Sequence, residues 1–239
     1  MSLYNALDPV AGCGIFNSEE YYDYISELFE TTDTYQTYLF DTVANTHKVL
    51  SDLISSKEHR ILDLGCGIGS FVNYLNINGF KNTTGVVNSQ KLFDISRKKY
   101  DINVVKDDMI EYMSKNKKSY DIIFNIESVG YVDLNAYFNA AQECLDDNGV
   151  IILKDYTTVG DPYDTGKYYG NYTFHNHETI IGAAKKFGFE VKVTPIDRRL
   201  TNQTHFLNSL KKINHKYISS SMFNSKNVIG FAMYTITKK

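Results

Sequence analysis

The sequence predicts an α/β fold: a mostly parallel, seven-stranded sheet with helices on both faces and an antiparallel last strand. The first observation is that short apolar runs alternate with amphipathic helical patterns from residue 60 onward. The second is that these runs are apolar on both faces, as are strands of a parallel sheet that helices cover on both sides. The third is that no crossover follows the final apolar run, so we expect that strand to pair antiparallel at the edge of the sheet.

Seven apolar runs are the predicted strands, and most of the segments between them show helical spacing of apolar residues. The strands are RILDL (60–64), TTGVV (83–87), INVVK (102–106), YDIIFNI (120–126), VIILKDY (150–156), FEVKVTPI (189–196) and NVIGFAMYTI (227–236). The helix after the fourth strand begins at the capping residue Asp133 and is expected to end at Asn148-Gly149.

Two further parts of the chain are expected to cover the binding edge of the sheet. Residues 1–57 form an N-terminal helical cap, whose last helix ends at about Ser51. The remainder, 58–239, is the sheet domain, with lid insertions at about 156–178 and 200–222. The first insertion is rich in Gly and Tyr, and long irregular loops of this kind usually act as lids or binding segments.

The composition argues against several classes of protein. The formal net charge is −3, and Lys and Arg are scattered, so the charge does not favour a nucleic-acid partner. Cys13, Cys66 and Cys144 show no zinc or redox spacing, which indicates a reducing, cytoplasmic setting. The N-terminus lacks the pattern of a signal peptide, and no apolar run approaches membrane-spanning length. Asp155 and Asp161 are too few carboxylates to predict a metal site.

The stretch RILDLGCGIGSF, after the first strand, is the main functional signal. Parallel sheets bind ligands at the carboxyl ends of their strands, and this turn is expected at that edge. Gly65 allows a tight turn, Gly67 lets the backbone approach a ligand, and Gly69 lets the next helix pack closely on the strand. The helix N-terminus adds free N–H groups and a partial positive charge.

Two kinds of cofactor fit such a turn, a nicotinamide dinucleotide and S-adenosylmethionine. The dinucleotide pattern requires a glycine where this chain has Ser70, and an acidic residue ending the second strand, where it has Val87 and Asn88. S-adenosylmethionine has an ammonium group in its methionine part, which needs an anion near the turn. Asp63 supplies one. The remaining alternative is a tight strand-to-helix turn without a ligand.

The motif DLGCGIGS strongly resembles the first motif of class I S-adenosylmethionine-dependent methyltransferases. The resemblance covers residues 58–155 well and the rest loosely. It implies a Rossmann-like fold, an enzyme that transfers a methyl group, and conversion of S-adenosylmethionine to S-adenosylhomocysteine. The cofactor-binding positions that it implies are Asp63, Gly65, Cys66, Gly67, Gly69, Asn88, Ser89, Asp107, Asp108, Asn125 and Tyr22.

Asp108 matches best the acidic residue that lies near the adenine amine in these enzymes, and Asp107 is adjacent. The alternative is that both residues only cap the following helix, where Asp is favoured. Tyr22 belongs to YYD at 21–23, a short match to the N-terminal cap of one subgroup, in which tyrosines lie over the cofactor.

That subgroup is the carbon methyltransferases of lipids and terpenoids, which includes cyclopropane fatty acid synthases and the sterol and geranyl diphosphate C-methyltransferases. Asn88 resembles the Thr or Asn that ends its second strand, and the segment NIESVGYVDLNAYF resembles the one after its fourth strand. Glu127 matches the Glu of that segment. The resemblance implies a small-molecule acceptor of lipid or terpenoid type.

Carbon methylation gives Glu127 a chemical role, since methylating an alkene produces a carbocation that must lose a proton. A carboxylate can stabilise the cation and accept the proton, and aromatic faces also stabilise cations. We therefore expect Glu127 and Tyr131 to be catalytic. The other tyrosines expected to line the pocket are Tyr156, Tyr163, Tyr168, Tyr169 and Tyr172.

Each of these roles has an alternative. Glu127 could hold the methionine part of the cofactor or cap the helix, and the tyrosines could be ordinary packing. His175 and His177 precede a helix, where most histidines are surface or capping residues.

Alternative functions also stay open. The first is oxygen or nitrogen methylation of a small molecule, the second a nicotinamide-dependent oxidoreductase, and the third a cofactor-binding subunit without chemistry of its own. We expect a monomer or a homodimer.

Overall fold

A computed structural model describes residues 47–48, 50–158, 163–164, 173–196 and 229–239. Most of the predicted N-terminal cap, 1–57, and all of the predicted 200–222 insertion lie outside these residues. The described end of the cap is helical up to Ser51, as predicted. In the described part of the chain, no helix is both long enough and apolar enough to cross a membrane.

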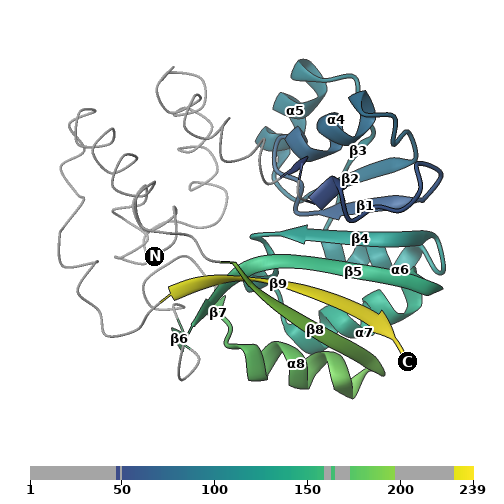
Figure 1. Cartoon of the computed structure of the whole chain (residues 1–239). Helices are drawn as coiled ribbons and strands as arrows, with labels where there is room; N and C mark the ends of the chain where they lie inside the picture. The colour runs from purple at the N-terminus through teal and green to yellow at the C-terminus, as the bar shows by residue number, and fades with distance from the viewer. Residues whose placement is uncertain (1–46, 49, 159–162, 165–172, 197–228) are drawn as a thin grey trace, which may run out of the picture.

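The predicted fold class is confirmed. Seven strands form one sheet in the order β3-β2-β1-β4-β5-β9-β8, and all are parallel except β9 (Figure 1). The strands are β1 (Ile61–Leu64), β2 (Thr83–Val87), β3 (Val104–Lys106), β4 (Tyr120–Ile126), β5 (Leu145–Thr158), β8 (Phe189–Ile196) and β9 (Ile229–Lys238). The strand order reverses between β1 and β4, which is where such sheets bind ligands.

The predicted place of the last strand at the edge of the sheet is wrong. β9 lies between β5 and β8 and pairs antiparallel with both, so β8 is the edge strand. The crossover after β5 brings β8 back parallel and leaves a gap of one strand, which β9 fills. The side chains of Ala232, Tyr234 and Ile236 alternate into the core, so β9 carries the burial pattern of an interior strand.

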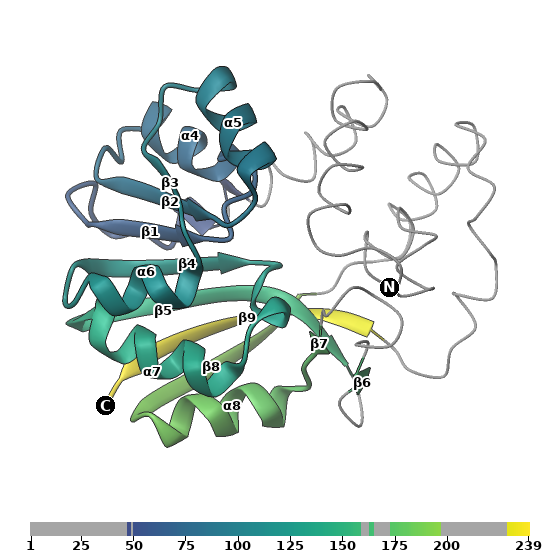
Figure 2. The same ribbon diagram turned by 180° about the vertical axis from the view of Figure 1, so that it is seen from behind.

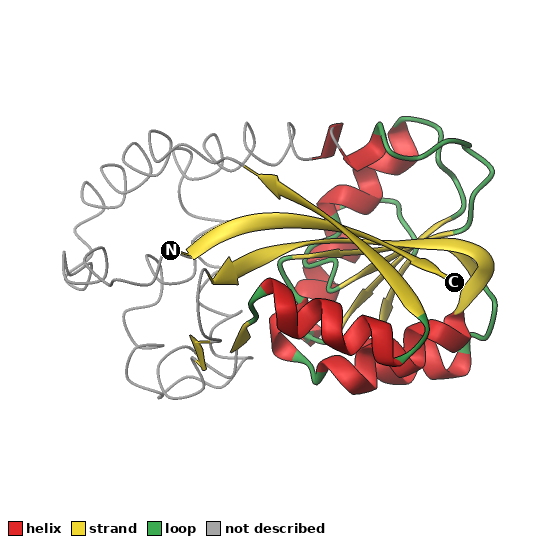
Figure 3. Cartoon of the chain, turned by 60° about the horizontal axis from the view of Figure 1, so that its bottom comes forward, coloured by secondary structure: helices red, strands yellow, loops and turns green. Residues whose placement is uncertain are grey.

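Helices cover both faces of the sheet (Figures 2 and 3). The helix α4 (Ser70–Ile77) packs on the face formed by Ile61, Ile122 and Phe124, and α5 (Gln90–Lys99) packs beside it over β2 and β3. The opposite face is covered by α6 (Met109–Lys115), α7 (Leu134–Cys144) and α8 (His177–Lys186). The strands alternate in the direction of their side chains, so apolar residues on both faces are buried.

The predicted end of α7 at Asn148-Gly149 is also wrong. The helix ends at Cys144, and residues 145–149 are already the bulged start of β5. Tyr120 pairs with Leu145 and Ile122 with Val150, so the β5 side of the ladder carries extra residues. A Cβ placed on Gly149 would lie 2.9 Å from the Asp121 carbonyl, so glycine allows the bulge to pass close to β4. The turn residues therefore shape a bulge here instead of a helix end.

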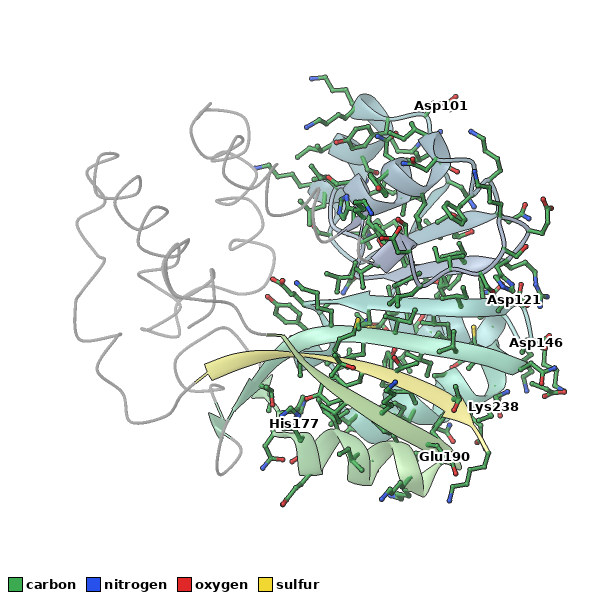
Figure 4. The ribbon with its side chains drawn as sticks, in the orientation of Figure 1. Asp101, Asp121, Asp146, His177, Glu190 and Lys238 are labelled. Atoms are coloured by element: carbon green, nitrogen blue, oxygen red, sulfur yellow. The ribbon has the colours of Figure 1, made fainter. Side chains whose placement is uncertain are left out.

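Ion pairs connect the strands at the amino end of the sheet. Arg60 binds Asp121 through its Nη2 at 2.6 Å and Asp146 at 3.1 Å, and these two carboxylates lie together where β4 and β5 begin (Figure 4). Within the predicted first insertion, β6 (Tyr163–Asp164) and β7 (Thr173–Phe174) form a short antiparallel ladder. The carboxyl ends of β1, β2, β3 and β4 lie at the opposite edge, where the predicted site residues follow.

Candidate cofactor and catalytic site

The glycine turn leaves β1 through three left-handed residues. The φ angles are +72° at Gly65, +58° at Gly67 and +78° at Gly69, a region that favours glycine. The amides of Gly65 and Cys66 both donate to the Val86 carbonyl, at 2.9 and 3.0 Å. The turn is thereby fixed against the end of β2, and α4 starts directly after it.

The three glycines have different surroundings. A Cβ placed on Gly65 would lie 2.5 Å from Ser128, and one on Gly69 would collide with Ile102. A Cβ on Gly67 would have nothing within 4 Å among the described residues. Gly65 and Gly69 therefore serve close packing, while Gly67 leaves its backbone open to a ligand.

Cys66, inside the turn, packs as a small apolar residue. A Cβ on Gly85 would lie 2.8 Å from the Cys66 Sγ, so β2 passes directly against this thiol. Burial raises the pKa of the Cys66 thiol, which makes it unreactive at neutral pH. The backbone of Cys66 is engaged as well, because its carbonyl accepts from the Gly69 amide at 2.9 Å.

Asp63 is a buried carboxylate at the carboxyl end of β1. It is 2 % exposed, and no side chain in the described part of the chain forms a hydrogen bond or ion pair with it. Burial raises the pKa of Asp63 to about 7. A positively charged group beside it would favour the ionised form. The site therefore fits a ligand that brings its own cation to the glycine turn.

The predicted ribose and adenine positions lie at the neighbouring strand ends. Asn88 is exposed after β2, and Ser89 caps α5 by accepting a hydrogen bond from the Leu92 amide at 3.4 Å. After β3, the Asp107 amide donates to the Val87 carbonyl at 3.2 Å. The ends of β2 and β3 are thus joined, and the structure brings these positions together.

The two aspartates after β3 already have local partners. Asp108 Oδ1 accepts from the amides of Ile110 and Glu111, at 2.8 and 3.2 Å, so Asp108 caps α6. Asp107 accepts from the Asp108 amide at 2.9 Å and from Lys115 at 3.1 Å. Capping, the alternative role for Asp108, is therefore present, and it uses only one of the two carboxylate oxygens.

Asn125 lies beneath the turn. Its side chain is fully buried, and its Nδ2 donates to the Leu64 carbonyl at 3.2 Å. Its Oδ1 has no hydrogen-bond partner among the described residues. The structure thus places Asn125 as a link between β4 and β1.

Glu127 directly follows β4 in a strained conformation. Its φ is +56°, in a region that costs non-glycine residues about 1–2 kcal/mol and recurs at functional sites. Its amide donates to the Lys154 carbonyl at 2.8 Å, and its carboxylate forms an ion pair with the Lys154 ammonium. One signal of this partner is present in the sequence, namely a lysine inside the apolar run VIILKDY.

The residues after Glu127 are held from the other side. Ser128 Oγ donates to the Leu64 carbonyl at 2.9 Å, and Asp155 Oδ2 accepts from the Val129 amide at 3.0 Å. A 3₁₀ turn, η2 (Val129–Tyr131), follows and ends in the half-buried Tyr131. The segment after β4 is thus fastened to both β1 and β5.

These observations describe a turn open to a cationic ligand and an acidic residue beside it. A model of the methyltransferase domain family matches residues 35–193 of the chain. The chain belongs to this family. It therefore carries a methyltransferase domain, whose cofactor is S-adenosylmethionine, as the sequence predicts. The residues around the turn fit it, since no described side chain brings a cation to Asp63 and no described atom fills the space at Gly67.

Solved structures of low sequence identity share the fold of the methyltransferase. Phosphoethanolamine N-methyltransferase 2 of Haemonchus contortus is 17% identical with a TM-score of 0.65, covering 81% of this chain and 52% of its own. Geranyl diphosphate C-methyltransferase of Streptomyces coelicolor A3(2) is 16% identical with a TM-score of 0.67, covering 82% and 76%. The [4+2]-cyclase SpnF is 16% identical with a TM-score of 0.65, covering 81% and 80%.

The present chain thus spans about half of the phosphoethanolamine methyltransferase. No curated protein sequence matches it. Because a cyclase shares this fold, the fold by itself does not identify the reaction.

A groove of about 580 Å³ adjoins η2 in the methyltransferase, between the start of α7 and α8. Tyr131, Asp133, Thr173 and His175 line it. The other predicted pocket residues do not line this groove among the described residues. The backbones of Tyr156 and Tyr163 lie in β5 and β6, and Tyr22, Tyr168, Tyr169 and Tyr172 lie outside the described residues.

Three of the described histidines are hydrogen-bonded, buried or packed against aromatic rings. His177 Nδ1 bonds the Tyr234 hydroxyl at 2.9 Å at the start of α8. Burial lowers the pKa of His175 to about 4. His47, which the sequence did not single out, stacks on the rings of Phe71 and Tyr74 at 5.0 and 5.4 Å. Burial and the charge of Lys154 lower the pKa of His47 to about 4.

Proposed function

We propose that the methyltransferase methylates a carbon atom of an apolar small molecule, a lipid or a terpenoid-like alkene. Glu127 stabilises the resulting cation and accepts its proton. The observation that supports this proposal is the position of Glu127, an acid held in a left-handed conformation between the glycine turn and Lys154. Strained acidic residues of this kind are typical of catalytic sites.

The cofactor is held by residues at the ends of three strands, β1, β2 and β3. Asp63 binds the ammonium of its methionine part, and the open backbone at Gly67 receives it against α4. Asn88 and Ser89 face the ribose, and Asp108 faces the adenine with the carboxylate oxygen that the cap does not use. When bound, S-adenosylmethionine supplies an electrophilic methyl group. The predicted contact of Tyr22 stays a prediction.

The ion pair on Glu127 favours carbon over oxygen as the methylated atom. A neighbouring ammonium stabilises the ionised carboxylate, which makes it a weak base. A weak base suffices for a carbocation, whose proton is very acidic, whereas a hydroxyl acceptor requires a stronger base. Once the bound cofactor has supplied a methyl group to an alkene carbon, Glu127 would stabilise the resulting carbocation and accept the proton that it loses. The ring of Tyr131 contributes to the wall of the pocket.

The comparisons support this proposal without deciding it. The similar fold of a geranyl diphosphate C-methyltransferase agrees with carbon methylation. The similar phosphoethanolamine N-methyltransferase keeps nitrogen methylation as the second candidate, because a nitrogen acceptor needs little base catalysis.

The test is Glu127→Gln, with Glu143→Gln as the matched control on the exposed end of α7. Turnover is measured at saturating methyl-labelled S-adenosylmethionine on a panel of alkene, amine and hydroxyl acceptors, and products are located by mass spectrometry. We expect a carbon-methylated alkene, turnover lowered about 100-fold in Glu127→Gln, and S-adenosylhomocysteine affinity within about twofold of wild type. Unchanged turnover, or methyl transfer to amines alone, would contradict the proposal.

A further inference from the structure

We propose that Lys154 is a positioning residue that balances the charge of Glu127 and fixes it beside the glycine turn. The cofactor then meets a neutral ion pair there, not a lone carboxylate. This inference rests on the proposed function, since it concerns the same site, but it makes a separate prediction about cofactor charge.

The first argument is the burial of the lysine. The Lys154 side chain is 6 % exposed in the middle of the sheet, while that of Glu127 is 23 % exposed. An ammonium buried to this degree is strongly destabilising unless a carboxylate pairs with it. The stability of the fold therefore requires Glu127 to stay close to Lys154, which restricts the rotamers of the acid.

The second argument is that β5 holds the segment after β4 from both faces. Lys154 and Asp155 are consecutive, so their side chains leave the strand on opposite faces. Lys154 binds the carboxylate of Glu127, and Asp155 binds the amide of Val129. The two contacts lie on either side of Ser128 and maintain the strained φ of Glu127.

The third argument is the position of the pair relative to the cofactor turn. Ser128, adjacent to Glu127, fills the space against Gly65 and donates to the Leu64 carbonyl. The charge of the pair therefore acts close to the turn at which the cofactor binds. S-adenosylmethionine carries a sulfonium charge that S-adenosylhomocysteine lacks, so the ratio of their affinities reports the net charge there.

The experiment measures both affinities by calorimetry, without an acceptor. Lys154→Met leaves a net negative charge, and we expect it to shift the affinity ratio about tenfold toward S-adenosylmethionine. Glu127→Gln leaves a net positive charge, and we expect a shift of about tenfold toward S-adenosylhomocysteine. The double variant should return to the wild-type ratio, and Lys154→Arg should keep it.

The controls are Lys117→Met and Glu143→Gln. These residues form a Lys–Glu pair of 3.1 Å whose side chains are 69 % and 49 % exposed. Both variants should leave the affinity ratio unchanged. Thermal denaturation adds a second measurement: Glu127→Gln removes the carboxylate that pairs with a buried ammonium, so it should lower the melting temperature, and the double variant should recover it.

Each outcome bears on one claim. Opposite shifts in the two single variants support the charge balance. Equal changes in both affinities, or no change in either, would show that Lys154 is only structural and overturn the inference while leaving the proposed function standing. If the wild-type protein binds neither compound, the proposed function itself fails. Should Glu127→Gln not fold, Lys154→Met and the double variant still show in which direction the ratio of the two affinities changes.

Discussion

Ser128 fills the space into which a side chain on Gly65 would extend: a Cβ placed on Gly65 would lie 2.5 Å from both the Cβ and the Oγ of Ser128. The turn after β1 and the segment after β4 are thus interlocked. Ser128 can reach this position only because Gly65 has no side chain and adopts a φ of +72°. The contact couples the cofactor turn to the residue that follows Glu127.

Gly65→Ala should therefore destabilise the protein. The left-handed φ costs about 1–2 kcal/mol, and the displacement of Ser128 about 1–3 kcal/mol. We expect the free energy of unfolding in urea to fall by about 2–5 kcal/mol. The matched control is Gly182→Ala in α8, where a Cβ meets no described atom within 4 Å, and where alanine should stabilise the helix by about 0.5–1 kcal/mol. Equal stability of Gly65→Ala and wild type would show that the segments are not interlocked.

Gly67→Ala separates binding from folding. A Cβ at Gly67 meets no described atom within 4 Å, so the folded state loses only the backbone preference, about 1–2 kcal/mol. The methyl group would instead occupy the space proposed for the cofactor. We expect S-adenosylhomocysteine affinity to fall at least about tenfold while the urea transition stays cooperative. A variant that binds as tightly as wild type would place the cofactor elsewhere.

Asp63 should make cofactor affinity depend on pH. Because burial raises its pKa to about 7, much of Asp63 is protonated below neutrality, and it must lose that proton to pair with an ammonium. Affinity for S-adenosylhomocysteine should therefore rise from pH 5.5 to 7.5, approaching tenfold per pH unit below 7.

Calorimetry at several pH values checks this, and buffers of different ionisation enthalpy count the released proton. Asp63→Asn should bind about 30-fold more weakly at pH 7.5 and lose the pH dependence, whereas Asp121→Asn, at the amino end of the sheet, should keep it. A wild-type affinity that does not depend on pH would show that Asp63 does not bind the amine of the cofactor.

The strands and the glycine turn could be predicted because their signals are local. A buried parallel strand is a short apolar run, and the left-handed turn requires glycines at fixed spacing, as Gly65 and Gly69 show. The errors concern information that is not local. The place of β9 depends on which gap the crossover to β8 leaves, and the fate of Asn148-Gly149 depends on the pairing of Leu145 with Tyr120.

The same distinction explains what was missed in the site. Glu127 could be found because it follows a strand within a motif, whereas its partner Lys154 is 27 residues away and is brought close only by the pairing of β4 with β5. His47 likewise has no chemical motif of its own, and its position over Phe71 and Tyr74 follows from packing of the cap end. Spacing along the sequence does not indicate such neighbours.

His47 should make the stability of the protein fall in mild acid. Its ordinary pKa is 6.5, and burial with the charge of Lys154 lowers it to about 4. Between these values the unfolded chain binds a proton at His47 and the folded chain does not, so the free energy of unfolding decreases as the pH falls from 6.5 toward 4. At pH 5 this amounts to about 2 kcal/mol.

His47→Phe keeps an aromatic ring against Phe71 but cannot titrate. Urea denaturation at pH 7.5 and 5 should therefore show a loss of stability about 1–2 kcal/mol smaller in the variant than in wild type, while Asp63, present in both proteins, contributes equally. An equal loss in the two proteins would mean that His47 takes up a proton in the folded state as readily as in the unfolded chain.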